Sequence, residues 1–82
     1  TTTIRFGLPA AGEVMVQIYS VTGQRVLSSR SEANSGGWFT YNWNGSTENG
    51  RTAASGVYIY RVQFSERDGK IWQKSGKMQL LK

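Results

Sequence analysis

The sequence contains no cysteine and no histidine, and it has a single proline. These absences exclude disulfide crosslinks, structural zinc sites, Cys/His nucleophile pairs and imidazole bases. The chain also lacks any apolar run near the ~20 residues that a membrane-spanning helix needs. Stability therefore has to come from packing alone.

The residues that are present describe one small domain rich in aromatic side chains. With 82 residues the chain is long enough for a single domain, and a domain of this size buries only about 60–65% of the surface of its unfolded chain. The three Trp, four Tyr and three Phe are the natural core, because each ring buries roughly 150–250 Å². Ten Gly indicate many short turns. The abrupt start in strand-like sequence is typical of a piece of a longer protein.

Ten Lys and Arg against five Asp and Glu give the chain a net charge of +5. Such an excess favours anionic partners such as lipopolysaccharide or a polysaccharide. Charges scattered along the chain are also typical of a solvated surface that keeps a small domain soluble. Basic and aromatic residues interleave from Arg61 to Lys74 without a nucleic-acid-binding motif, so no nucleic-acid partner is expected.

Period-two alternation of apolar side chains predicts β-strands along most of the chain. A third strand is expected from Gln24 to Ser29, followed by a polar loop from Arg30 to Gly37. Turns are expected at Pro9–Gly12, Thr22–Gly23 and Arg67–Gly69, because proline lacks an amide donor and glycine accepts a positive φ. The side chains expected on buried strand faces are Ile4, Phe6, Leu8, Val14, Val16, Ile18, Phe39, Tyr41, Trp43, Tyr58, Tyr60, Val62 and Phe64.

The remaining segments complete an all-β chain. A long corner from Asn44 to Gly56 is expected to hold at most one short strand, near Arg51–Ala53. The last strand, or pair of strands, runs from Lys70 to Lys82 with a kink near Gly76. About seven strands with turn signals every ~8–12 residues favour an immunoglobulin-like or fibronectin III-like sandwich that forms one domain, residues 1–82. An up-and-down barrel with a similar strand count is the alternative.

No constellation of residues points to catalysis, and the chain is predicted not to be an enzyme. The five acidic residues fall in or beside predicted turns, where they would be solvated rather than held as a tuned pair. Ser55 has no histidine that could serve as its base. The loop from Asn44 to Gly50 superficially resembles a calcium loop, but Glu48 is its one carboxylate. No metal site and no cofactor is therefore expected.

Three aromatic residues, Trp38, Tyr41 and Trp72, are candidates for a glycan-stacking platform. Flat aromatic faces bind the C–H faces of sugar rings, with neighbouring amide side chains as donors. Trp43 is expected in the core instead, whereas Trp38 and Trp72 are expected on the opposite pleat face.

The terminal run from Lys74 to Lys82 interleaves lysines with apolar side chains. An edge strand whose charges block aggregation explains this pattern, and so does a short amphipathic peptide accessible to a receptor. The sequence leaves both interpretations open. An exposed final strand would also permit an edge-to-edge homodimer.

Six segments follow one another in a specific order and spacing: Thr2–Pro9, Val16–Val26, Trp43–Gly45, Asn49–Gly50, Ser55–Tyr58 and Lys77–Lys82. With them the chain resembles, over nearly its whole length, the C-terminal sorting domains of type IX secretion cargo proteins. The stretch from Val14 to Val62 is also similar to the immunoglobulin-like domain of flagellar hook-capping proteins. Two positions depart mildly from the sorting-domain pattern: Ser20, where an acidic or amide residue is common, and Asn44, where Asp is frequent.

The resemblance implies a non-catalytic C-terminal module of a protein secreted to the outer surface of a Gram-negative bacterium. Such domains direct their cargo through the outer-membrane secretion machinery and are commonly cleaved as the cargo is attached to lipopolysaccharide. By position, the parts read by the translocon would be Gly23 and the segment Lys77, Met78, Gln79, Leu80, Leu81 and Lys82. The alternatives are a glycan-binding accessory module of a secreted hydrolase and a structural spacer or assembly module.

Overall fold

The computed structural model describes residues 2–81, which form six antiparallel β-strands. The strands are β1 (Thr2–Leu8), β2 (Gly12–Ser20), β3 (Arg25–Ala33), β4 (Gly37–Trp43), β5 (Gly56–Glu66) and β6 (Ile71–Leu80). They make an all-β, immunoglobulin-like sandwich, as the alternation predicted, with six strands rather than about seven.

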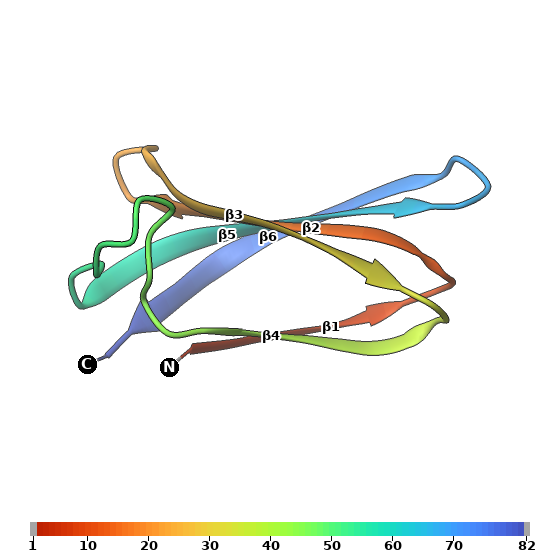
Figure 1. Ribbon diagram of the computed structural model, residues 1–82, viewed down its shortest axis with the longest axis horizontal. Coiled ribbons are helices and arrows are strands. Elements are labelled where there is room, and N and C mark those ends of the chain that lie inside the picture. The colour runs from red at the N-terminus through yellow and green to blue at the C-terminus, as the bar shows by residue number, and fades with distance from the viewer. Residues whose placement is uncertain (1, 82) are drawn as a thin grey trace.

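The strands divide into two sheets that face each other (Figure 1). One sheet has four strands in the order β3-β2-β5-β6, and the other pairs β1 with β4. Because the strands belong to two separate sheets, the barrel alternative does not hold. Both edges of the small sheet, and the outer edges of β3 and β6, have no strand partner among the described residues.

The core lies between the two sheets and is built by the predicted alternation. Every second residue of β1 and β2 is buried, because strand side chains alternate between faces and only one face meets the other sheet. The predicted inner-face residues are either buried or packed against the buried cluster. Ala33, Ala53 and Leu80 complete that cluster.

Two hairpin turns depend on glycines with positive φ. Gly23 (φ 91°) closes the β2–β3 hairpin, and its N–H donates to the Ser20 carbonyl at 3.0 Å. Gly69 (φ 100°) closes the β5–β6 hairpin with the same type of bond to Glu66. An L-residue with a Cβ rarely adopts such angles, so the glycines fix these turns, as predicted.

The third strand is longer than predicted, because β3 continues through Arg30 to Ala33 where a loop was expected. This segment is polar because β3 is an edge strand whose outer face meets water. Its charges also find partners, since Arg30 lies 3.8 Å from Glu13 and Glu32 lies 4.0 Å from Arg67. Ala33 then returns the strand to the core, 9% exposed. The loop shrinks to residues 34–36.

The predicted extra strands do not form. Near Arg51–Ala53 only an isolated bridge between Ser46 and Thr52 is present, because two close turns leave no length for a ladder. The last segment is one strand, β6, which pairs with β5 through Gly76 without a register shift. The expected kink at Gly76 is therefore wrong. Glycine is needed there because the Tyr60 ring occupies the space of a side chain, 2.7–2.9 Å from where a Cβ would lie.

The corner between the sheets is held by two aromatic side chains. Trp43, 1% exposed, donates from its Nε1 to the Ser46 carbonyl at 2.9 Å. Tyr58 packs edge-on against Trp43 with ring centroids 5.0 Å apart, and its hydroxyl donates to the Ala54 carbonyl at 2.7 Å. A tyrosine that bonds back to the chain at the start of a strand is the tyrosine corner of immunoglobulin-like sandwiches.

Candidate recognition surfaces

The two parts of the chain predicted to be read by a translocon, the Gly23 turn and the end of β6, lie at the same end of the large sheet. The Gly23 turn follows β2, and the row of paired residues Tyr19, Ile59 and Lys77 crosses from β2 to β6. Figure 1 shows the β2–β3 turn, the loop before β5 and the end of β6 at this same end of the molecule. We call it the Gly23 end.

The last residues of β6 alternate between exposed and buried positions. Lys77 and Gln79 are exposed on the outer face, and Leu81 beyond the strand is 69% exposed. Met78 and Leu80 point inward, and Leu80 is only 1% exposed. The Gln79 carbonyl also accepts a hydrogen bond from the Thr2 hydroxyl at 2.8 Å. Two residues of the predicted recognition segment thus face the core, Leu80 as a member of it and Met78 packed against it, and Lys82 lies outside the described residues.

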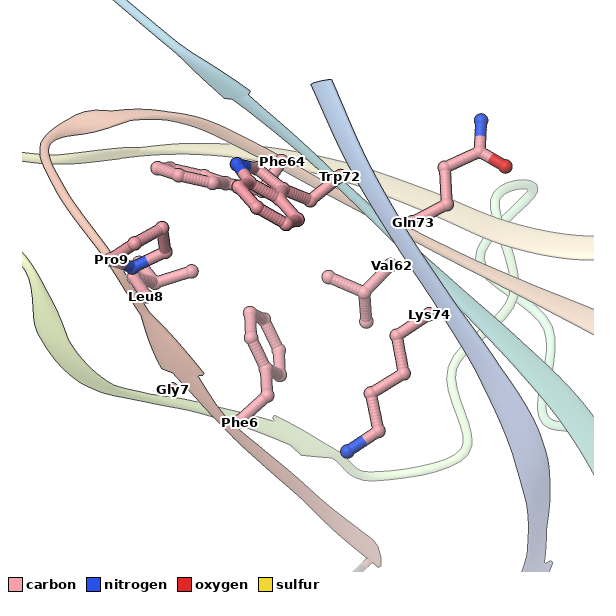
Figure 2. Close-up of a pocket in the computed structure, with 9 residues that line it drawn as sticks. All are labelled: Phe6, Gly7, Leu8, Pro9, Val62, Phe64, Trp72, Gln73 and Lys74. Carbon is pink, nitrogen blue, oxygen red and sulfur yellow. The ribbon is translucent and has the colours of Figure 1, made fainter. Parts of the chain in front are cut away.

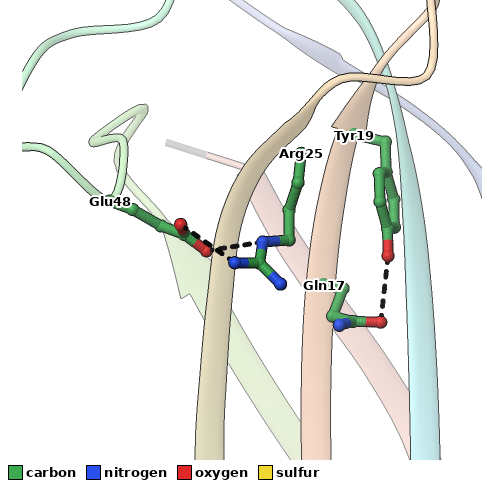
Figure 3. A network of polar contacts seen from close by, with 4 residues as sticks. All are labelled: Gln17, Tyr19, Arg25 and Glu48. Atoms are coloured by element: carbon green, nitrogen blue, oxygen red, sulfur yellow. Dashed lines mark hydrogen bonds and ion pairs between the residues drawn. The ribbon is translucent and has the colours of Figure 1, made fainter.

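The Gly23 end is braced by contacts between β3 and the loop before β5. A register shift between Ile18 and Tyr19 forms a bulge at Val26, whose carbonyl accepts the Glu48 N–H at 3.0 Å. The Glu48 carboxylate meets the Arg25 guanidinium at 3.0 Å and 3.5 Å (Figure 3). In the same view Tyr19 donates from its hydroxyl to Gln17 at 3.1 Å. The two contacts of Glu48 join β3 to the loop before β5, whereas the Tyr19–Gln17 hydrogen bond lies within β2.

Trp38 lies where the sequence predicted, on the outer face of the small sheet, 71% exposed. The Arg5 guanidinium sits 4.6 Å from its ring centroid. The ring also lies beside Gly7, its cross-strand partner, which leaves space for it. Thr3 and Asn42, bonded to each other at 2.8 Å, lie further along this outer face.

Trp72 does not lie on the outer face, which corrects the prediction. It pairs with Phe64, and cross-strand partners share a face, so its ring points toward the space between the sheets. It is still 52% exposed, because it borders an open space between β1 and β6. Tyr41 also faces inward and is half-buried against the core. Trp38, Tyr41 and Trp72 are therefore not brought together on one surface.

Trp72 instead lines an apolar groove between β1 and β6, which we call the β1/β6 groove (Figure 2). The groove has a volume of about 470 Å³. Phe6, Leu8 and Pro9 line one side, and Val62, Phe64 and Trp72 line the other. The Lys74 side chain extends from β6 toward the side of Phe6 and Val62, whereas the Gln73 side chain points away from the groove (Figure 2). Sequence alternation placed Phe6 and Phe64 inward but gave no sign that they would border an open groove.

All five carboxylates have a structural partner. Glu13, Glu32 and Glu48 form the ion pairs with arginine described above. Glu66 accepts the Trp72 Nε1–H at 2.6 Å, and Asp68 accepts the Lys70 backbone N–H at 3.2 Å within the hairpin turn. Among residues 2–81 no cluster of His, Cys, Asp and Glu is placed to hold a metal ion. The same residues form no helix long and apolar enough to cross a bilayer.

Two features of this surface were missed by sequence reasoning. The tyrosine corner has a recognisable signal, a tyrosine at the start of a strand just after a loop, and Tyr58 fits it. The inward position of Lys74 had a signal too, because it lies two residues from Trp72 and shares its face. That signal could be read only once the pairing of Trp72 with Phe64 was known.

Comparison with known proteins agrees with the observed fold. The FlgD Ig-like domain family matches residues 1–68 of the sequence. No curated protein shows significant similarity to the chain. Among solved structures, FlgD from Xanthomonas campestris, which was studied for hook capping in flagellar assembly, superposes with a TM-score of 0.81 at 21% sequence identity. The match covers 94% of this chain and 56% of that chain. At this identity it supports the fold only. Because the family match covers most of the sequence, the chain belongs to the FlgD Ig-like domain family, a family of non-catalytic modules.

Proposed function

We propose that this domain is a sorting and surface-attachment module that carries its parent protein through the type IX secretion machinery to the outer surface of a Gram-negative bacterium. The sequence resemblance motivates this proposal, and one structural observation supports it. Gly23 and the Lys77–Leu81 segment, more than fifty positions apart in the sequence, lie at the same end of one sheet. A single receptor could contact both there.

The contact surface at the Gly23 end is made of exposed side chains only. Val21 is 66% exposed in the turn, and Lys77, Gln79 and Leu81 are exposed at the end of the chain. The inward residues Met78 and Leu80 would act by holding the strand in place. Deleting Lys77–Lys82 as a whole would therefore unfold the domain, because it removes a fully buried leucine and four residues of β6 pairing.

The test is export of a periplasmic reporter fused to this domain in a host with a type IX system. A variant with Lys77→Glu, Gln79→Ala and Leu81→Ser changes the exposed residues and leaves Leu80 in place. The matched control, Lys70→Glu with Ile71→Ser, changes exposed residues at the opposite end of the sheet. We expect the first variant to lose export and the control to keep it. Equal export of both, with thermal unfolding of each showing an intact fold, would contradict the proposal.

A glycan-binding role is a second candidate, supported by Trp38. Its ring is the most exposed large apolar side chain of residues 2–81. Arg5 lies against the ring, and Thr3 and Asn42 lie further along the same face. Affinity electrophoresis against lipopolysaccharide and soluble polysaccharides tests it, with Trp38→Ala as the variant and Trp72→Ala as the control. Retardation that Trp38→Ala abolishes supports the role. A domain that neither exports a reporter nor binds a glycan would serve as a spacer or assembly module.

A further inference from the structure

The β1/β6 groove is open because two sheet edges that border it have no strand beside them. β1 pairs only with β4, and β6 pairs only with β5. The two strands meet where the Thr2 hydroxyl bonds the Gln79 carbonyl, and the groove lies further along, beside Phe6–Pro9 and Trp72–Lys74. A third strand beside β1 would lie about 4.8 Å from it and over the groove.

The walls of the groove are already in position. Phe6, Val62 and Phe64 are each at most 6% exposed and belong to the core cluster. Trp72 is held by the hydrogen bond from its Nε1 to the Glu66 carboxylate at 2.6 Å. A ligand would therefore meet a preformed apolar surface and would not have to order it, which lowers the cost of binding.

Lys74 gives the groove a charge. It pairs with Val62 across the β5–β6 ladder, so it lies on the inner face of an edge strand. Among residues 2–81 it has no carboxylate partner, and the five Asp and Glu side chains each contact another group. The net charge of +5 leaves the surface with cations in excess. A ligand that supplies a carboxylate above Val62 would complement this lysine.

We propose that the β1/β6 groove binds an extended segment of a partner protein, which adds as a third strand to the free edge of β1. The side chains of this segment that face the groove are apolar residues on either side of one carboxylate. The apolar residues contact Phe6, Val62 and Trp72, and the carboxylate pairs with Lys74. Backbone hydrogen bonds to β1 provide affinity, and the inward side chains provide specificity. This site is independent of the Gly23 end, so its test can fail without affecting the proposed export function.

Inward lysines on edge strands also prevent edge-to-edge aggregation, and a second copy of this chain is the other occupant to consider. The guarding lysine and the second copy each predict a result different from that of the proposal. A lysine that only guards the edge disfavours any added strand, because burying its ammonium group costs desolvation, and it predicts no preference for an acidic peptide. A second copy adding its own β1 or β6 edge strand would bring no Asp or Glu, because among residues 2–81 neither strand contains one.

The probes are two synthetic peptides, acetyl-TVTETVT-amide and acetyl-TVTKTVT-amide, titrated into the ¹⁵N-labelled domain and followed by NMR. The variant is Lys74→Glu, and the matched control is Lys77→Glu, which lies on the outer face of the same strand. We expect the acidic peptide to shift the amides of residues 6–8 and the Trp72 indole. Lys74→Glu should lower the affinity for the acidic peptide by roughly tenfold or more and make the domain prefer the lysine peptide. Lys77→Glu should change the affinity for the acidic peptide less than about twofold.

Four results would overturn the proposal. They are the absence of binding, equal affinity for both peptides, equal effects of Lys74→Glu and Lys77→Glu, and shifts confined to residues outside the groove. A fifth contrary result would come from sedimentation of the free domain. A dimer whose formation shifts the same groove resonances would assign the groove to a second copy instead.

Discussion

At the scale of single residues, two aromatic side chains lie against glycines across a strand pair. Tyr60 lies over Gly76 and Trp38 lies beside Gly7, each with the glycine as its cross-strand partner. A glycine weakens a strand because it has no side chain to pack, and an aromatic partner that covers it restores part of the loss. The two glycines differ in tightness, since a Cβ at Gly76 would lie 2.7 Å from Tyr60 and a Cβ at Gly7 3.9 Å from Trp38.

Gly12 leaves no room for a side chain. A methyl group there would lie 2.2 Å from the Ser65 carbonyl oxygen and 2.8 Å from the Phe64 ring. Backbone atoms cannot yield as a flexible side chain does, so we expect Gly12→Ala to lower the free energy of unfolding by roughly 2–3 kcal/mol. Gly7→Ala is the control, since its methyl has space, and it should be neutral or stabilise by about 0.5–1 kcal/mol. Urea denaturation measures both. Equal stability of the two variants would contradict the predicted contact.

The tyrosine corner makes a second prediction at this scale. Tyr58 is 9% exposed, and its hydroxyl donates to the backbone carbonyl of Ala54, an exposed residue, so removing the hydroxyl removes this hydrogen bond. We expect Tyr58→Phe to destabilise the domain by about 1–1.5 kcal/mol, the usual contribution of one hydrogen bond. Tyr41→Phe is the matched control, because within residues 2–81 no hydrogen bond of its hydroxyl is recorded, and it should change stability by less than about 0.5 kcal/mol. Guanidinium denaturation curves that place both variants together would show that the corner bond contributes nothing.

At the scale of elements, the sequence predicted those strands whose two faces differ. β1, β2, β4 and β5 each have one face against the other sheet, so apolar and polar residues alternate and their positions follow from the pattern. β3 was predicted too short. Its Arg30–Ala33 segment pairs fully with β2, but an edge strand with polar residues on its outer face and serines on its inner face carries almost no alternation. Local composition there favoured a loop, and strand pairing decided otherwise.

The candidate sites were predictable only in part, for a related reason. The exposure of Trp38 follows from its place in an alternating strand, and the structure agrees. The inward direction of Trp72 does not follow from β6 alone, because this edge strand carries exposed residues on both faces. Its direction is set by its pairing with Phe64 across the β5–β6 hairpin, and this register is not visible in the pattern of β6 itself. The grouping of the Gly23 turn with the end of β6 likewise depends on sheet order, which no local pattern contains.

The free edge of β6 makes a prediction about solubility. Lys77 closes the row Tyr19–Ile59–Lys77 on the outer face, and its charge discourages another strand from pairing there. Lys77→Ile would make this row apolar, so we expect self-association that increases with concentration. Lys70→Ile, in the hairpin turn beyond the strand, is the matched control and should remain monomeric. Sedimentation velocity over a tenfold concentration range distinguishes them. A monomeric Lys77→Ile variant would show that the charge does not protect this edge.

At the scale of the whole molecule, the two sheets depend on each other unequally. The large sheet has two central strands, β2 and β5, each paired on both sides. The small sheet is a single strand pair, and two isolated strands are at best marginally stable in water. It persists because Ile4, Phe6 and Trp43 are buried against the large sheet. The ion pairs of residues 2–81 contribute little to this, because none involves β1 or β4 and exposed ion pairs are worth at most about 1 kcal/mol each.

This asymmetry predicts the order in which the domain opens. Because the small sheet is held by side-chain packing and by few hydrogen bonds to the large one, it can detach without breaking the β2–β5 ladder. Native-state hydrogen exchange should therefore show the highest protection in β2 and β5 and distinctly lower protection in β1 and β4. Binding of the acidic peptide beside β1 should raise the exchange protection of β1 and β4 selectively. A ligand that binds only while the small sheet is packed on the large one stabilises that packed state by mass action. Uniform protection across all six strands would mean that the domain opens as one unit, and the two-stranded sheet would then owe its stability to more than the packing described above.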